Sequence, residues 1–148
     1  MYSATIDIPA SPSRVFAAIT DPKLAMQWQP EAVEVTPPEG GLRVGAVSRA
    51  LVEEFGRRFS VEFLVVTLEP DVKIAYDVTS PMWTGRVEYV LTPRPPATKV
   101  SFLLVPNPPK AIPFPIARAL AVLTRPLMQW RFRSRLAALR RVVVETNG

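Results

Sequence analysis

The sequence predicts an α+β domain in which one apolar face of an antiparallel sheet lies toward a long C-terminal helix. Short β-type runs separated by turn residues fill the chain from Ala32 to Val105. Residues from Ile112 to Glu145 have a helical composition, and two short helical segments follow a first strand. The pairing should be antiparallel, because short strands with tight connections cannot make the long crossovers that parallel neighbours need.

The length and composition restrict the function. With 148 residues and 48% hydrophobic side chains, we expect a single domain over residues 1–148 with a substantial core. The chain has no cysteine and no histidine, which excludes disulfides, thiol nucleophiles, histidine-dependent triads and thiolate or imidazole metal sites. We therefore expect no metal and no cofactor, and we identify no catalytic residue.

We expect neither a signal peptide nor a membrane-spanning helix. The segment Met1–Pro9 includes Asp7 and lacks the basic and apolar regions of a signal peptide. The most apolar stretch, Ala111–Met128, is interrupted by three prolines and two arginines. A membrane-spanning helix needs about 20 nearly uninterrupted apolar residues, so we expect a cytoplasmic protein.

The N-terminal region reads as one strand and two short helices. The β-rich run Tyr2–Pro9 alternates in part. Ser11 can cap a helix whose first residue is Pro12, where the missing N–H of proline costs nothing. Asp21-Pro22 then ends this helix and starts a second one, which runs through Leu24–Trp28.

The central runs predict a sheet of six to seven strands with one apolar face. The runs are Ala32–Thr36, Val44–Glu53, Arg58–Glu69, Lys73–Thr79, Trp83–Thr92 and Thr98–Val105. Alternation places one set of side chains on a common face: Phe59, Val61, Phe63, Val65, Ile74, Tyr76, Val78, Val87, Tyr89, Leu91, Val100, Phe102 and Leu104. Charged residues alternate with them, so the other face should be solvated.

The C-terminal helix carries two apolar stripes that differ in phase. One stripe comprises Ile116, Leu120, Leu123, Leu127 and Trp130, and the other comprises Met128, Phe132, Leu136, Leu139 and Val143. The second stripe is rotated by roughly 120° from the first at 3.6 residues per turn. The change falls at Pro126, which removes a backbone hydrogen bond, so we predict a bend or short break there.

The order of these elements resembles the helix-grip plan of the START-like (SRPBCC) superfamily, in particular its polyketide cyclase/dehydrase and lipid-transport branch. The matching segments are Ile6–Pro9, Ser11–Phe16, Ile19–Pro22, Trp28–Pro30, Tyr89–Pro93, Thr98–Val100 and Leu136–Glu145. The resemblance implies a curved sheet wrapped around the C-terminal helix and an apolar cavity between them. It also implies ligands such as lipids, sterols or aromatic polyketides.

We therefore hypothesise that the protein binds or transports a lipid-like or aromatic polyketide-like molecule. The expected ligand-binding residues are Phe59, Val61, Phe63, Tyr76, Trp83, Val87, Tyr89, Phe102, Leu120, Leu123 and Leu127. The hydroxyls of Tyr76 and Tyr89 could bind a polar end of the ligand, or both could be core tyrosines. Trp83 either lines the cavity mouth, with Gly85 leaving room for the ligand, or covers the end of a strand. For Trp28 we favour a packing role.

Two alternative functions use other residues. A cyclase or dehydratase would need an inward acid or base, but alternation turns Asp77, Arg86 and Glu88 to solvent. An interaction protein would instead dock an anionic membrane or an acidic partner through the arginines of the C-terminal helix, at positions 118, 125, 131, 133, 135, 140 and 141. These form a solvated helix face or contact an anionic membrane. We expect no nucleic-acid partner, because no reader motif accompanies the charge, and we infer no oligomeric state.

Overall fold

The computed structural model describes residues 1–29, 31–54, 56–81, 83–107 and 113–146. Its elements are β1 (Tyr2–Ile8), α1 (Pro12–Thr20), α2 (Pro22–Trp28), β2 (Ala32–Thr36), β3 (Val47–Glu54), β4 (Arg57–Glu69), β5 (Lys73–Thr79), β6 (Thr84–Arg94), β7 (Ala97–Pro106) and α3 (Phe114–Thr146). These bounds match the predicted elements closely. Ile112, the predicted first residue of the last helix, lies outside the described residues.

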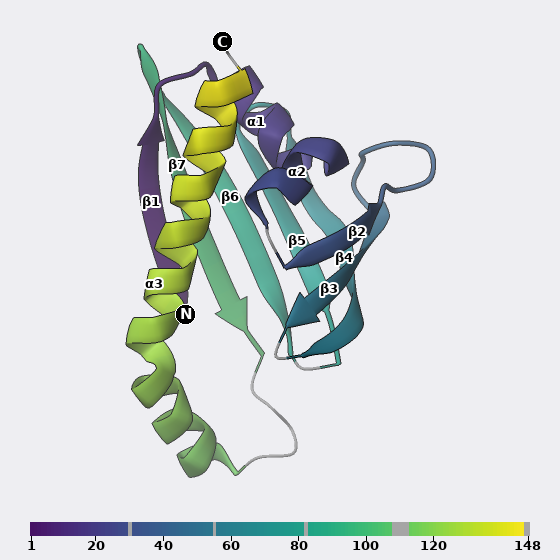
Figure 1. Ribbon diagram of the computed structural model, residues 1–148, viewed down its shortest axis with the longest axis vertical. Helices are drawn as coiled ribbons and strands as arrows, with labels where there is room; N and C mark the ends of the chain where they lie inside the picture. Colours follow the sequence, from purple (N-terminus) through teal and green to yellow (C-terminus); the bar gives the residue numbers. More distant parts are fainter. Residues whose placement is uncertain (30, 55, 82, 108–112, 147–148) are drawn as a thin grey trace.

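The strands form one seven-stranded antiparallel sheet in the order β1-β7-β6-β5-β4-β3-β2. The long helix α3 lies across one face of this sheet, beside β1, and α1 and α2 cover one end of the same face (Figure 1). The predicted helix-grip architecture is therefore confirmed, including the two short helices after the first strand.

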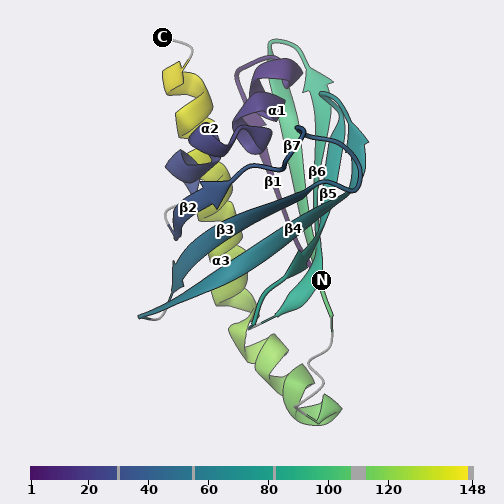
Figure 2. The ribbon, with the colours of Figure 1, turned by 90° about the vertical axis from the view of Figure 1, so that its right-hand side faces the viewer.

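The sheet is curved rather than flat. Figure 2 shows β2, β3 and β4 curling away from β5, β6 and β7, so that they reach around the side of α3. Register shifts occur between Val65 and Thr67 in β4 and between Ala32 and Glu34 in β2. Such irregularities bend a strand and increase its twist, which turns this edge of the sheet toward the helix.

The predicted helix caps are present at α1 and α2. The backbone N–H of Arg14 donates to Ser11 Oγ at 3.4 Å, and that of Lys23 donates to Asp21 Oδ1 at 2.9 Å. Pro12 and Pro22 each occupy the first turn of their helix. These two helices close the end of the sheet, where Trp28 is buried and donates from Nε1 to the carbonyl oxygen of Ala18 at 2.9 Å.

The alternation along the strands sorts the side chains as predicted. The apolar set faces α3, and the opposite face carries the ion pairs Arg49–Glu62, Lys73–Glu88 and Arg86–Asp77. The buried apolar residues form two clusters. The larger joins β1, β6, β7, α1 and the C-terminal part of α3, and the smaller comprises Ala50, Val52, Val61 and Val78. Only partly buried side chains, Tyr76 and Val87, pack against both clusters, so the fully buried core does not run continuously across the concave side of the sheet.

Helix α3 continues through Pro126 without a break. The N-terminal part of the helix, which contains Pro126, bends away from the line of the rest (Figure 1). The two predicted stripes have different environments. Phe132, Leu136, Leu139 and Val143 are buried in the larger cluster, whereas the stripe from Ile116 to Trp130 is exposed. The bend therefore divides a core-packed C-terminal part from an N-terminal part that extends beyond the sheet.

Candidate ligand-binding cavity

A cavity of about 430 Å³ lies between the concave face of the sheet, α2 and the middle of α3. It occupies the space between the two apolar clusters. The volume is within the range of about 300–1,000 Å³ that is typical of small-molecule sites. Side chains therefore do not fill this part of the molecule.

One wall of the cavity is a chain of aromatic rings in contact. Trp28 meets Tyr89 edge-on with ring centroids 6.2 Å apart, and Tyr89 lies 5.3 Å from Phe102. Phe102 in turn lies 4.9 Å from Phe132 of α3, which lies 5.7 Å from Tyr2. Tilted and edge-on pairs of this kind stabilise one another beyond their buried area. This wall is therefore a fixed apolar surface.

The facing wall comes from the curled strands and β5, and the predicted site residues are spread over both walls. Phe63 and Tyr76 pack edge-on at 5.8 Å. Eight of the eleven predicted ligand-binding residues line the cavity: Phe59, Val61, Phe63, Tyr76, Trp83, Val87, Tyr89 and Phe102. The alternation of the strands, which identified these positions in the sequence, is what brings them together.

The other three predicted site residues are not at the cavity. Leu120, Leu123 and Leu127 lie on the exposed stripe of α3 and do not line the space. The sequence analysis placed these three leucines at the cavity, but they do not reach it, because this part of the helix extends past the sheet. Its contribution to the cavity comes instead from Thr124 and Met128, on the neighbouring side of the helix.

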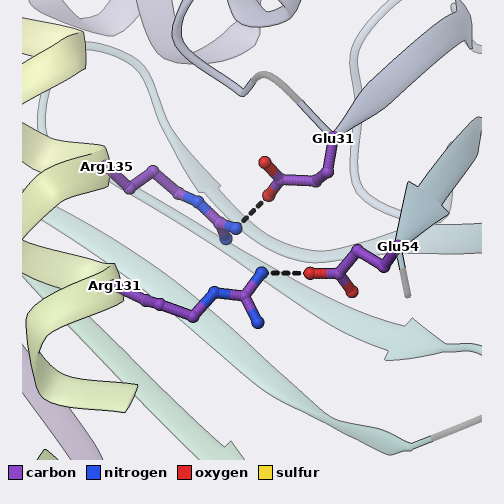
Figure 3. Close-up of polar contacts among 4 residues, drawn as sticks. All are labelled: Glu31, Glu54, Arg131 and Arg135. Atoms are coloured by element: carbon purple, nitrogen blue, oxygen red, sulfur yellow. Dashed lines mark hydrogen bonds and ion pairs between the residues drawn. The ribbon is translucent and has the colours of Figure 1, made fainter. Parts of the chain in front are cut away.

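Two ion pairs cross from α3 to the curled edge of the sheet. Arg131 Nη2 bonds Glu54 Oε1 at the end of β3, and Arg135 Nη2 bonds Glu31 Oε1 just before β2 (Figure 3). All four residues line the cavity, and their side chains are only 17% to 29% exposed. A guanidinium has five N–H donors, so each arginine keeps donors beyond the one that its glutamate uses.

The sequence analysis missed these four residues. It assigned Arg131 and Arg135 to a solvated or membrane-facing surface. Their spacing of four residues, with Met128 one turn earlier, places all three on one side of α3. The signal was therefore present, but the position of the glutamates at the ends of a curled edge was not evident from the sequence.

The two inward tyrosines are held neutral by burial. Burial raises the pKa of Tyr89 to about 12, with smaller opposing effects from Arg135 and Glu31. Burial likewise raises the pKa of Tyr76. Neither hydroxyl hydrogen-bonds another of the described residues. Both remain available to a ligand as neutral donors and acceptors.

Trp83 and Gly85 lie at one end of the cavity with different roles. Trp83 lines the cavity and is 38% exposed, in agreement with a position at its mouth. A Cβ on Gly85 would lie 2.6 Å from the carbonyl oxygen of Val105 and 2.9 Å from the Cα of Pro106. Glycine is needed there because β6 and β7 approach closely, and not to leave room for a ligand.

The carboxylates considered for catalysis lie outside the cavity. Asp77 and Glu88 pair with Arg86 and Lys73 on the outer face of the sheet. No group of three or more carboxylates in the described part of the chain is placed to hold a metal ion. The ionisable side chains at the cavity are therefore two arginine–glutamate pairs and three tyrosines, and they lie beside the uncharged polar side chains of Thr20, Gln29, Ser48 and Thr124.

Comparison with known proteins agrees with this architecture. The model of the family described as "Polyketide cyclase / dehydrase and lipid transport" matches residues 2–144. Similar solved structures include TTHA0849 from Thermus thermophilus, with a TM-score of 0.72 and 20% identity over 99% of each chain. Another, Ara h 8.0201, has a TM-score of 0.71 and 14% identity over 97% of each chain.

A third similar structure is DynU16, a protein of the dynemicin biosynthetic locus. It has a TM-score of 0.65 and 19% identity, over 99% of this chain and 47% of that chain. At these identities the structures show a common fold. No protein with a curated description matches the sequence.

Proposed function

Because the chain belongs to the polyketide cyclase/dehydrase and lipid transport family, we propose that it binds a lipid-like or aromatic polyketide-like molecule in the cavity between its sheet and α3. The observation that carries the proposal is the unfilled space of about 430 Å³ between the two apolar clusters. An apolar guest placed there would remove its own surface and that of the walls from water, at about 25 cal/mol per Å².

The polar groups of the cavity suggest the chemistry of the ligand. Arg131 and Arg135 have N–H donors that their glutamate partners do not use, and the hydroxyls of Tyr76 and Tyr89 have no protein partner among the described residues. A purely hydrocarbon guest would leave these groups unsatisfied, which costs about 1–3 kcal/mol for each. The preferred ligand therefore has an apolar or aromatic body and at least one acceptor oxygen.

Two neighbouring residues of β4 provide a matched test. Val61 is buried and lines the cavity, whereas Ser60 is exposed on the opposite face of the same strand. The variant Val61→Trp should occupy the cavity, and Ser60→Trp adds the same side chain outside it. The probe is 1-anilinonaphthalene-8-sulfonate, which has an aromatic body and an anionic oxygen group. Native mass spectrometry of gently purified protein identifies any bound guest.

We expect the probe to bind wild type and Ser60→Trp alike, and Val61→Trp to bind at least tenfold more weakly while keeping its circular dichroism spectrum. If Val61→Trp does not fold, Ala50→Leu fills the same space with a smaller change. Equal binding by a folded cavity variant and by wild type would contradict the proposal. The proposal would also be contradicted if the wild-type protein neither bound the probe nor retained any guest.

A further inference from the structure

An unpartnered apolar stripe runs along the N-terminal part of α3. Its five residues are Ile116, Leu120, Leu123, Leu127 and Trp130, which are 54%, 48%, 77%, 59% and 63% exposed. At 100° per residue they fall within an arc of roughly 80° on one side of the helix. Five large exposed side chains on one helix face form a contiguous patch rather than scattered exposed residues, and such patches mark interaction sites.

The position of the stripe shows that none of the described residues outside α3 covers it. Figures 1 and 2 both show the N-terminal part of α3 extending past the ends of the neighbouring strands. The core-facing side of the helix, with Phe132 and Leu136, is turned away from the stripe by more than a quarter turn. The stripe therefore faces outward even where α3 packs on β1.

The charge around the stripe indicates the partner. Within α3 the only acidic residue is Glu145, near the C-terminal end, whereas Arg118, Arg125 and Arg133 lie along the exposed part. At 100° per residue Arg133 flanks the stripe, whereas Arg118 and Arg125 lie on the opposite side of the helix, and Arg125 donates to the carbonyl oxygen of Met1 and lies over the Tyr2 ring. An anionic surface that met the stripe would therefore be attracted mainly by Arg133, and less by Arg118, because charges more than a Debye length of about 8 Å apart are largely screened.

A second copy of this chain fits the stripe less well. The apolar spacing covers only two heptads and includes Pro126, whereas a coiled coil needs about three to four heptads. None of the described helices is long and apolar enough to cross a membrane.

We propose that the stripe docks the protein on the surface of an anionic lipid bilayer, with α3 lying in the interface. Apolar side chains on one face and arginines on the others are the pattern of interfacial helices, and the tryptophan at the end of the stripe suits the headgroup region. Thr124 and Met128 beside the stripe line the cavity. Docking would therefore bring one end of the cavity to the lipid. The proposal does not depend on which ligand the cavity holds.

The test is co-sedimentation with vesicles of phosphatidylcholine alone and of equal parts phosphatidylcholine and phosphatidylglycerol. Leu123→Ser/Leu127→Ser removes two exposed side chains of the stripe, and Leu64→Ser is the matched control on the outer sheet face, where Leu64 is 37% exposed. Arg118→Gln/Arg133→Gln lowers the charge of α3, with Arg94→Gln at the distant β6–β7 turn as its control.

Wild type should bind the anionic vesicles, lose binding as salt rises, and show a blue shift of tryptophan emission that Trp130→Phe abolishes. The leucine double variant should bind at least tenfold more weakly, because two apolar side chains are no longer buried in the lipid. The arginine double variant should bind up to about fivefold more weakly, mainly through the loss of Arg133. Both control variants should bind like wild type.

Three outcomes would overturn the proposal. One is that folded wild type binds neither kind of vesicle. Another is that the leucine double variant binds as tightly as wild type. The third is that the chain self-associates through the stripe, so that the leucine double variant becomes monomeric while vesicles remain unbound. The last result would assign the stripe to a second copy of the chain.

Discussion

The Arg135–Glu31 pair links the middle of α3 to the start of β2 across the cavity, and its removal should have a measurable cost. Both side chains are largely buried, at 23% and 17% exposure. Exposed ion pairs contribute about 0.2–1 kcal/mol, whereas removing one partner of a fully buried pair costs about 3–5 kcal/mol. For this intermediate burial we expect Arg135→Met to lower the free energy of unfolding by about 1–3 kcal/mol.

A double-mutant cycle with Glu31→Gln separates the pair from the individual side chains. The double variant should be less destabilised than the sum of the single variants, with a coupling energy of about 1 kcal/mol or more from urea denaturation. The exposed pair Arg49–Glu62, at 61% and 50% exposure, has the same chemistry on the outer face. Its cycle (Arg49→Met with Glu62→Gln) should give less than about 0.5 kcal/mol.

The cycle also reports on access to the cavity. In the described part of the chain, α3 packs mainly against β1, α1 and α2, so the ion pairs provide its link to the curled edge of the sheet. Arg135→Met should therefore speed dissociation of the naphthalene probe. Equal coupling energies for the two cycles, or an unchanged dissociation rate, would show that the pair does not tether the helix.

Two further predictions follow from single residues. Burial raises the pKa of Tyr89 in the folded protein to about 12, above its ordinary value of about 10. As pH rises, the unfolded chain therefore releases this proton before the folded protein does. The free energy of unfolding should be unaffected below about pH 10 and should fall between about pH 10 and 12 by up to about 3 kcal/mol. Tyr89→Phe should flatten that slope in urea denaturation, and a parallel slope in both proteins would contradict the assignment. Gly85→Ala should destabilise by about 1–3 kcal/mol, since its Cβ would meet the backbone of β7 at 2.6 Å. A melting temperature equal to that of wild type would show that β6 and β7 separate at little cost.

Local rules were sufficient to predict most of the fold. Ser11 and Asp21 have the capping role that their side chains and the following prolines indicate. The period of two along β4 and β6 places Val61 and Tyr89 on the cavity side. These predictions held because alternation and capping depend only on neighbouring residues, and tertiary packing did not override them.

The errors concern how far elements extend in space. A helix of 33 residues is about 50 Å long at 1.5 Å per residue, whereas the 11 residues of β6 span about 37 Å. The excess of about 12 Å corresponds to about eight helical residues, so this comparison of lengths could have excluded Leu120 from the cavity but not Leu123 or Leu127. The partners of Arg131 could not be identified in the same way, because the curl of β3 depends on a register shift in β4.

The polar groups of the cavity favour binding over acid–base catalysis. A general acid or base works best with a pKa near the operating pH. Burial raises the pKa of Tyr89 to about 12, further from neutral pH than its ordinary value, so its phenolate is scarce there. The hydroxyl of Tyr89 and the remaining N–H donors of Arg131 and Arg135 are well suited to hold an acceptor oxygen in a fixed place. A chemical step in this cavity would have to rely on the conformation that the cavity imposes on the bound molecule. The rate of such a reaction would then fall in Val61→Trp in proportion to the loss of binding.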